Sequence, residues 1–393
     1  MGPLEHAERR NLTLVETFVT IARNETGSSP QKIVQVTGHS AETVEKAVGT
    51  LIDRGYVRAP GQLRDQETAV HVVDDCCVLG VRILPTRLIG VVTNLRCRTL
   101  TVGGQTLRME HPLENQGASV DTVISGVTQL TRDLTQRLPR DYKCLGLGVE
   151  LGGHIHPASG QVIYSPNLQW HDVPLGKRLR EATTLEVTVE NDVNALAVAE
   201  QWFGDGHGIG SFAVILLAEG IGCGLVVNND LFHGASGIAG ELGHIVVDPD
   251  GPNCRCGNRG CLESIATDRA ILRAIKTGKP RHEKAPGTVA EAVRLARDGD
   301  VVARDTFRHA GEALARAISI LLNVLNPEKI IIHSLHPQAT ELLWERVDGV
   351  LPTYTFSTAF RDCDIKRKMV AVDLGAQGAA AVAISQFLNL SQP

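Results

Sequence analysis

The first part of the chain carries apolar side chains at helical spacing. Residues 11–22 form one such segment, and a shorter one over 31–36 follows. A further helix is expected to begin after an N-cap at Ser40 and to end at Gly55. A short hydrophobic strand would start at Tyr56. Helix, tight glycine turn, helix and strand in this order are typical of a winged helix-turn-helix.

From about Val70 the pattern changes to short apolar runs separated by polar loops, and residues 59–70 are interpreted as a linker. Three amphipathic helices are predicted over 118–138, 289–297 and 302–326. The runs interpreted as buried strands are CCVLGVRIL, RLIGVVTNL, CLGLGVEL, FAVILLA, CGLVVN and KIIIH. Strands interleaved with helices predict an α/β architecture with at least two sheets.

The charge of the chain restricts how its first part could bind DNA. The 393 residues carry a formal net charge of −5, which gives no overall attraction to nucleic acid. Residues 1–60 balance seven Lys or Arg against seven Asp or Glu, so a small helical bundle for dimerisation or regulation remains an alternative. Glutamate can accept from cytosine, so acidity does not exclude base contacts. The residues expected to contact DNA are Ser40, Glu42, Thr43, Lys46 and Arg58.

The stretch from Gly240 to Glu263 has the spacing of a metal site. His244 is followed by Cys254, Cys256 and Cys261. One imidazole and three thiolates are the ligand set of a closed tetrahedral zinc site, which has no open position for a catalytic water. The spacing therefore predicts a structural zinc.

Buried free thiols or a disulfide are the alternatives for these cysteines. The chain has nine cysteines, an odd number, and no apolar signal segment, which disfavours disulfides. The six cysteines outside the metal segment lie in apolar contexts and are interpreted as core thiols in a reducing cytoplasm. Zinc remains the favoured interpretation.

Three further segments precede the metal segment, at 165–176, 189–204 and 218–227. Taken singly, an Asn-Asp pair is most often a helix N-cap, and a glycine-rich turn is most often a hairpin. Together they place amides and carboxylates, such as Asn191 and Asp192, near a predicted strand end. Each sugar hydroxyl both donates and accepts, so this mixture suits a polyhydroxylated ligand.

The run SPNLQW, ENDVNALAVAE, GIGCGLVV, GIAGELGH and CRCGNRGCLES resembles the ROK family of sugar kinases and sugar-responsive repressors. The resemblance covers the chain from about residue 75, and the N-terminal helices match the repressor branch. It implies a two-lobed actin-like α/β ATPase fold over 69–393, preceded by a winged helix-turn-helix and linker over 1–68.

The resemblance also implies roles for individual residues. The zinc ligands would be the His244 and cysteine set already identified by spacing. In kinase members, the aspartate matching Asp192 acts as general base on the sugar hydroxyl. The residues that would contact the sugar are Asn167, Asn191, Asp192, Glu241, His244 and Glu263.

The phosphate-binding loops depart from the kinase pattern. The segment LGVRILPTRLIGVV has Arg82 where kinases carry an acid, and Ile83 to Pro85 replace the glycines. The second loop, AEGIGCG, places Glu219 where its charge would repel a polyphosphate. The segment KIIIHSLHP lacks the glycine pair expected beside a nucleotide. These departures predict that kinase activity is lost and that there is no catalytic residue.

The sequence therefore predicts a cytoplasmic transcriptional regulator, expected to be a repressor of sugar-metabolism genes. It would bind operator DNA and a sugar or sugar-phosphate effector, hold a structural zinc, and form a homodimer or homotetramer. No apolar run approaches the roughly 20 residues of a membrane helix, so no membrane insertion is expected. Two alternatives remain: an active ATP-dependent sugar kinase, and a regulator controlled by a partner protein.

Overall fold

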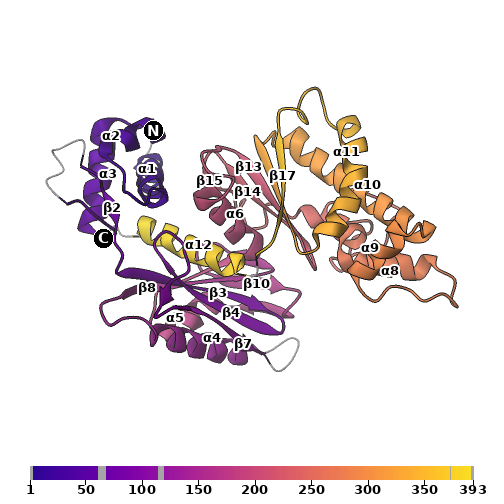
Figure 1. Cartoon of the computed structure of the whole chain (residues 1–393), viewed down its shortest axis with the longest axis horizontal. Helices are drawn as coiled ribbons and strands as arrows, with labels where there is room; N and C mark the ends of the chain where they lie inside the picture. The colour runs from indigo at the N-terminus through magenta and orange to yellow at the C-terminus, as the bar shows by residue number, and fades with distance from the viewer. Residues whose placement is uncertain (1–2, 61–67, 114–118, 372, 391–393) are drawn as a thin grey trace. The chain divides into compact units, whose positions relative to one another are not determined.

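The computed structural model describes residues 3–60, 68–113, 119–371 and 373–390. The chain divides into two compact units, shown in Figure 1. Unit 1 comprises Met1–Gly204 and Asp373–Pro393, and unit 2 comprises Asp205–Val372. Unit 2 is therefore inserted into unit 1 in the sequence.

Unit 1 begins with the predicted winged helix-turn-helix. Its elements are α1 (Pro3–Arg23), α2 (Pro30–Thr37), α3 (Ala41–Asp53), β1 (Val57–Arg58) and β2 (His71–Val72). Strands β1 and β2 pair antiparallel, so the interval 59–70, predicted as a linker, connects two strands of one hairpin. Residues 61–67 of that interval lie outside the described part of the chain.

Local hydrogen bonds fix the turn between α2 and α3. Gly38 ends α2 with φ 72°, a left-handed conformation that glycine adopts without a Cβ clash. Ser40 then begins α3, because its Oγ accepts from the backbone N–H of Thr43 at 3.2 Å. The helices pack through a buried apolar set comprising Phe18, Ile21, Ile33, Val44, Val48 and Leu51. The predicted turn and caps are confirmed.

The rest of unit 1 is built on a five-stranded mixed sheet in the order β12-β8-β3-β4-β7. Its strands are β3 (Cys76–Leu84), β4 (Arg87–Asn94), β7 (Arg108–Pro112), β8 (Lys143–Leu151) and β12 (Val187–Asn191). The remaining strands of unit 1 are β5 (Thr101–Val102), β6 (Gln105–Thr106), β9 (His154–His156), β10 (Gln161–Ser165) and β11 (Trp170–Val173). The helices that accompany them are α4 (Val120–Thr135), α5 (Leu175–Thr183), α6 (Asp192–Phe203) and α12 (Leu374–Leu390).

Helix α12, yellow in Figure 1, packs against β3, β8 and α6. Two strand glycines permit this approach. A Cβ on Gly80 would overlap the carbonyl of Ala376, and a Cβ on Gly148 would overlap the carbonyl of Ala379. On the α6 side, a Cβ on Gly378 would lie 2.6 Å from the carbonyl oxygen of Ala195. Helix α12 is therefore held against its neighbours at backbone-contact distance.

Unit 2 is built on a second five-stranded sheet, in the order β15-β14-β13-β16-β17. Its strands are β13 (Phe212–Leu217), β14 (Ile221–Val227), β15 (Asp230–Leu231), β16 (Lys329–Ser334) and β17 (Asp364–Met369). Its helices are η1 (Leu242–His244), α7 (Leu262–Ala266), α8 (Asp268–Gly278), α9 (Val289–Arg297), α10 (Val301–Val324) and α11 (Pro337–Tyr354). The six strands and three helices predicted from the apolar runs are all present, each within a few residues of its expected bounds.

No helix among the described residues combines the length and hydropathy needed to cross a bilayer.

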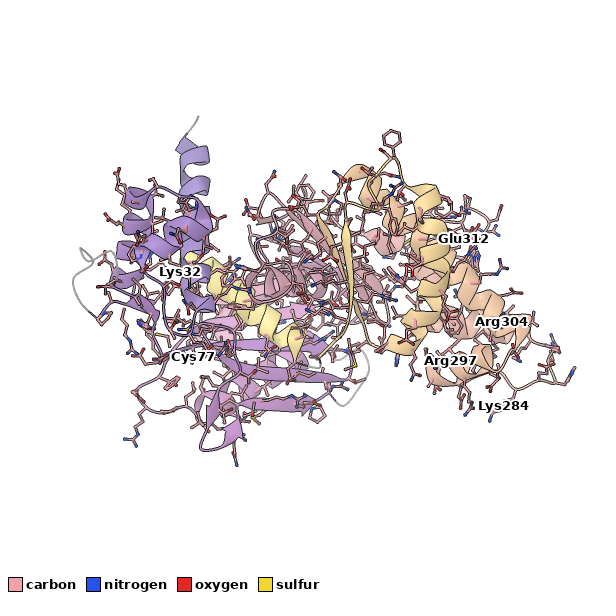
Figure 2. The ribbon with its side chains drawn as sticks, turned by 45° about the horizontal axis from the view of Figure 1, so that its top comes forward. Lys32, Cys77, Lys284, Arg297, Arg304 and Glu312 are labelled. Atoms are coloured by element: carbon pink, nitrogen blue, oxygen red, sulfur yellow. The ribbon has the colours of Figure 1, made fainter. Side chains whose placement is uncertain are left out.

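A carboxylate network fastens α10 to α11 in unit 2. Glu312 of α10, labelled in Figure 2, accepts from Arg346 of α11 at 2.7 Å and from the hydroxyl of Tyr354 at 3.0 Å. Arg316 adds a contact at 3.2 Å. The hydrogen bond from Arg346 is the largest of several effects that lower the pKa of Glu312 to about 2. The ionised carboxylate thus stabilises the folded state at neutral pH.

We expect Glu312→Gln to lower the free energy of unfolding at pH 7 by about 1–2 kcal/mol. The pKa of Glu312 is lowered on folding, so the stabilisation is present above its unfolded value and is lost as the pH falls towards about 2. Urea unfolding of the variant and wild type between pH 7 and 3 measures this. A stability difference that stays constant over this range would contradict the assignment.

Candidate metal centre and polar cavity

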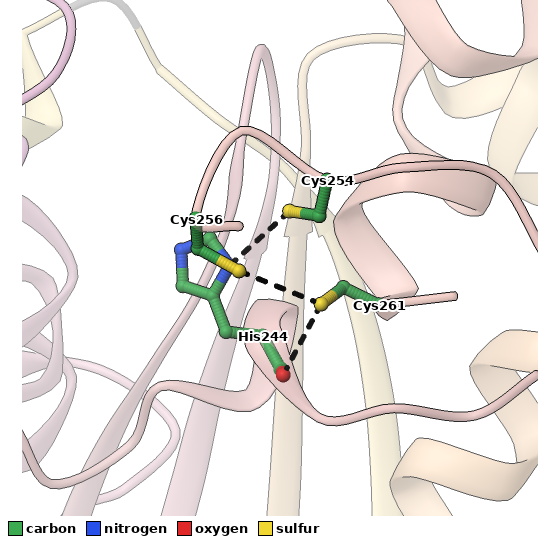
Figure 3. Close-up of side chains that lie close together, drawn as sticks. All are labelled: His244, Cys254, Cys256 and Cys261. Carbon is green, nitrogen blue, oxygen red and sulfur yellow. Dashed lines mark hydrogen bonds between the residues drawn. The ribbon is translucent and has the colours of Figure 1, made fainter. Parts of the chain in front are cut away.

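The metal cluster lies in unit 2, where η1 and the loop before α7 bring four side chains together (Figure 3). The ligand atoms of His244, Cys254, Cys256 and Cys261 all lie within 4.8 Å of one another. The His244 Nδ1 is 3.6 Å from the Cys254 Sγ, and the Cys256 and Cys261 sulfurs are 3.7 Å apart. The structure thus joins the four residues whose spacing predicted a metal site.

These distances fit a tetrahedral ion. Metal–sulfur bonds of about 2.3 Å at tetrahedral angles place ligand atoms about 3.8 Å apart, close to the observed separations. The backbone supports the cluster, because the N–H of Cys254 donates to the carbonyl of Asn258 at 2.8 Å. The same loop turns through Gly257 and Gly260, both at positive φ. Three thiols and one imidazole in this geometry can hold a metal ion.

Two predicted ligand-binding carboxylates flank the cluster. Glu241 lies just before η1, and its Oε2 is 3.8 Å from the Nε2 of His244, the ring nitrogen opposite the one that faces the cysteines. Glu263 lies on α7 and is buried, with Arg255 Nε 2.8 Å from its Oε1. The backbone N–H of Ile221 also donates to Glu263 Oε2, at 3.4 Å. Arg255, which the sequence did not single out, thus ties the cysteine loop to Glu263.

In unit 1, the remaining predicted ligand-binding residues gather where β12 passes into α6. Asn191 is the N-cap of α6, because its Oδ1 accepts from the backbone N–H of Val193 at 2.9 Å. Its Nδ2 donates to the carbonyl of Gly153 at 2.9 Å. The N-cap interpretation weighed for this Asn-Asp pair is therefore confirmed. Asn191 holds the first turn of α6 in place, and with it Asp192.

Asp192 and Asn167 lie on one cavity of about 40 Å³. A Cβ on Gly152 would lie 3.6 Å from both the Asn167 Nδ2 and the Asp192 Oδ2, so these groups face each other across a glycine. A buried water needs roughly 10–15 Å³, so the cavity has room for a few waters or a ligand hydroxyl. The lining also includes residues not predicted as ligand contacts, namely Arg82, Pro85, Glu150 and Ser165.

Arg82 and Glu150 form an ion pair at this cavity. The Arg82 Nε is 3.0 Å from the Glu150 Oε1, and the Glu150 side chain is 1% exposed. Burial raises the pKa of Glu150 to about 8, while the charge of Arg82 opposes this. Burial likewise raises the pKa of Asp192 against the same opposing charge. Glu150 Oε2 has no hydrogen-bond partner among the described residues, so it can accept from a group that enters the cavity.

The predicted DNA-contacting residues lie on the N-terminal elements. The Ser40 Oγ accepts the N-cap hydrogen bond from the backbone N–H of Thr43, and it also lies 2.7 Å from the Thr43 Oγ1. Lys46 and Glu42 pair at 2.7 Å on the exposed face of α3. Arg58 of β1 pairs with Asp74 at 2.8 Å. The exposed face of α3 thus presents paired charges and no basic stripe.

Comparison with known proteins places this architecture. A family model described as "ROK family" matches residues 89–386. The xylose repressor of Caldicellulosiruptor bescii is 27% identical over 357 residues, which cover 88% of this chain and 87% of the repressor. The glucokinase of Thermotoga maritima is 36% identical over 247 residues, which cover 60% of this chain and 78% of the kinase.

Among solved structures, a ROK family transcriptional regulator described as a homologue of the E. coli MLC protein has a TM-score of 0.77. The two chains are 23% identical, and the match covers 97% of each. This likeness confirms the predicted fold class, a two-lobed actin-like α/β architecture. Because the family model spans most of the chain, this protein belongs to the ROK family.

Proposed function

We propose that this protein is a DNA-binding transcriptional repressor of sugar-metabolism genes, and that it responds to a sugar or sugar-phosphate effector. One observation carries the proposal: a winged helix-turn-helix, with its recognition helix exposed, precedes the ROK domain in the same chain. The similarity to the xylose repressor of C. bescii supports it, because the match covers 88% of this chain and 87% of the repressor. Operator DNA, a homodimer or homotetramer, and a cytoplasmic location belong to the same proposal.

Each unit carries polar groups that we propose as effector contacts. In unit 1, Asn167 and Asp192 supply donors and acceptors on the cavity, and Asn191 holds Asp192 in place. In unit 2, the proposed contacts are Glu241, His244 and Glu263. A ligand shifts a regulator between states only by its difference in affinity for them, so these contacts must change on switching.

The absence of kinase activity is part of the proposal. Arg82 carries its charge to the cavity that holds Asp192, the residue matching the catalytic base of kinases. The charge of Arg82 opposes the rise in the pKa of Asp192 that burial causes, so Asp192 accepts a proton less readily than burial alone would allow. Pro85 lines the same cavity and has no N–H to donate to a phosphate. Glu219 adds an anion in the second loop.

An active sugar kinase is the second candidate, favoured by the 36% identity to a glucokinase. The two functions differ in their use of ATP, which the first experiment below measures. A regulator controlled by a partner protein would give neither a sugar nor an ATP response there.

The metal would be a structural zinc held by His244, Cys254, Cys256 and Cys261. The S₃N donor set and the 3.6–3.7 Å separations support zinc, which prefers this soft, tetrahedral environment. When bound, the ion cross-links the loop that carries Arg255 to η1. The loop would thereby hold Glu241 and Glu263 in place.

We expect a sugar to stabilise the purified protein against heat, and ATP to leave it unchanged. D-xylose, D-glucose, N-acetylglucosamine, their phosphates and ATP form the test panel. A ligand at about 100 times its Kd adds about 2.7 kcal/mol of stability, a shift on the order of 5 °C. Asp192→Asn should abolish the sugar shift. Asp121→Asn, in the first turn of α4, is the matched control and should retain it.

Two results would overturn this assignment. An ATP-dependent shift together with transfer of phosphate to the sugar would establish the kinase. A sugar shift that survives Asp192→Asn would remove Asp192 from the effector site.

We expect the protein to select specific duplexes from a random DNA library through α3. Lys46→Glu should weaken retention of the selected duplex and reduce its salt dependence by about one phosphate contact. Lys284→Glu is the matched control, because Lys284 is also exposed but belongs to unit 2 (Figure 2). If both variants lost retention of the duplex equally, the interaction would depend on the overall charge of the protein and not on α3. No selected duplex at all would contradict DNA binding.

We expect one zinc per chain by elemental analysis, and its loss in Cys256→Ser. The variant should be less stable by on the order of 2 kcal/mol or more, because metal binding contributes directly to folding. Its sugar-induced shift should also shrink. Asn258→Ser, in the same loop but outside the donor set, should keep the metal. Wild-type stability in Cys256→Ser would contradict a structural role.

A further inference from the structure

Two helices of unit 1 run from the cavity to the N-terminal domain. Helix α6 begins at Asp192, which lines the cavity. Helix α12 begins one residue before Gly375, and a Cβ on Gly375 would overlap Glu150 Oε1 and lie 3.1 Å from Arg82 Nη1. Both helices therefore start beside residues of the same cavity.

The other ends of these helices contact the winged helix-turn-helix. Near the end of α6, the carbonyl of Trp202 accepts from Arg23 of α1 at 2.8 Å, and the Trp202 ring lies 6.3 Å from that of Phe18. Near the end of α12, the carbonyl of Leu388 accepts from Arg54 at 2.5 Å. Arg54 is the C-cap of α3, the recognition helix. Each helix thus ends on an arginine of the N-terminal domain.

The two helices also pack against each other. A Cβ on Gly378 of α12 would come 2.6 Å from the carbonyl oxygen of Ala195 on α6. Along the strands, Gly80 and Gly148 leave α12 no space for a side chain between the backbones. Packed elements without free volume shift together, because they cannot deform continuously. At 1.5 Å per residue, α6 and α12 extend roughly 18 and 26 Å.

We propose that α6 and α12 form a paired coupling element that links the state of the Arg82–Glu150 cavity to the placement of the winged helix-turn-helix, with Arg23 and Arg54 as its positioning residues. The inference rests on the proposed function. A group that enters the cavity and engages Glu150 changes the Arg82–Glu150 contact, which abuts the first turn of α12. A displacement of α12 carries the Leu388 carbonyl with it and therefore acts on Arg54.

The structure offers a matched control for the two arginines. Arg96 follows β4 and also donates to backbone carbonyls of the N-terminal domain, at 2.7 Å to Ala22 and 3.0 Å to Asn24. It makes the same kind of contact as Arg23 and Arg54. Among the described residues, the Arg96 side chain makes no hydrogen bond or ion pair with α6 or α12, so it has no part in the proposed coupling.

The experiment perturbs the cavity and reads amide hydrogen exchange in the N-terminal domain of the full chain. Glu150→Gln and Asp192→Asn are isosteric changes, and either suffices if the other fails to fold. We expect exchange to change by about fivefold or more in peptides covering 18–23 and 48–54. Adding Arg54→Met should abolish the change over 48–54, and adding Arg23→Met should abolish it over 18–23. Adding Arg96→Met should leave both.

A change confined to β8 and the first turn of α6, with the N-terminal peptides at wild-type rates, would overturn the coupling. The coupling would also be overturned if the exchange rates over 18–23 and 48–54 still changed when the cavity variant also carries Arg23→Met or Arg54→Met. Arg54→Lys should restore the change over 48–54, because lysine can still donate to the Leu388 carbonyl. The hydrogen-exchange experiment needs no ligand. A missing sugar response in the thermal-shift panel would therefore refute the proposed function, whereas the coupling is tested by the exchange rates alone.

Discussion

The architecture of unit 1 depends on backbone-to-backbone contact between α12 and the central strands of its sheet. Gly80 on β3 and Gly148 on β8 allow the carbonyls of Ala376 and Ala379 to approach where a Cβ would stand. This brings a segment that follows unit 2 in the sequence onto the sheet formed before it. Helix α12 contacts the sheet, the cavity beside it and the N-terminal helices.

Each unit carries a buried glutamate paired with an arginine. In unit 1 the pair is Glu150 with Arg82, and in unit 2 it is Glu263 with Arg255. A buried carboxylate needs such a partner, because desolvation otherwise favours its protonated form. A polyhydroxylated ligand that engages either glutamate must share it with a resident cation. At the proposed effector contacts, the arginines would therefore influence which ligand hydroxyls are accepted.

How far the sequence predicts the structure depends on whether the signal is local. The four residues of the candidate metal cluster lie within 18 residues, and the strands are unbroken apolar runs, so both were predicted. Helix α12 was not, because its Ala- and Gly-rich sequence is buried on several sides and carries no apolar stripe. Strand β1 was predicted from Tyr56 onward, whereas its partner β2 was not, because two residues are too few for alternation to be visible.

The cavity was predicted only in part, for a similar reason. Asn167 and Asp192 were found through a family motif, and Arg82 was noticed only as a departure from one. Its partner Glu150 is 68 positions away, and no spacing rule connects them. A signal was nevertheless present: Glu150 is the one charged residue in the apolar run CLGLGVEL. An acid inside a buried strand needs a partner or a ligand.

The insertion of unit 2 into unit 1 has a consequence for biosynthesis. Unit 2 is one continuous segment, so all of it is synthesised before α12. Unit 1 lacks α12 during that interval, and its central strands expose the surface around Gly80 and Gly148. At roughly 5–20 residues per second, synthesis of the 168 residues of unit 2 takes about ten seconds or more. The nascent N-terminal domain therefore emerges long before the helix whose carbonyl holds Arg54, and this contact can form only after α12 has been synthesised.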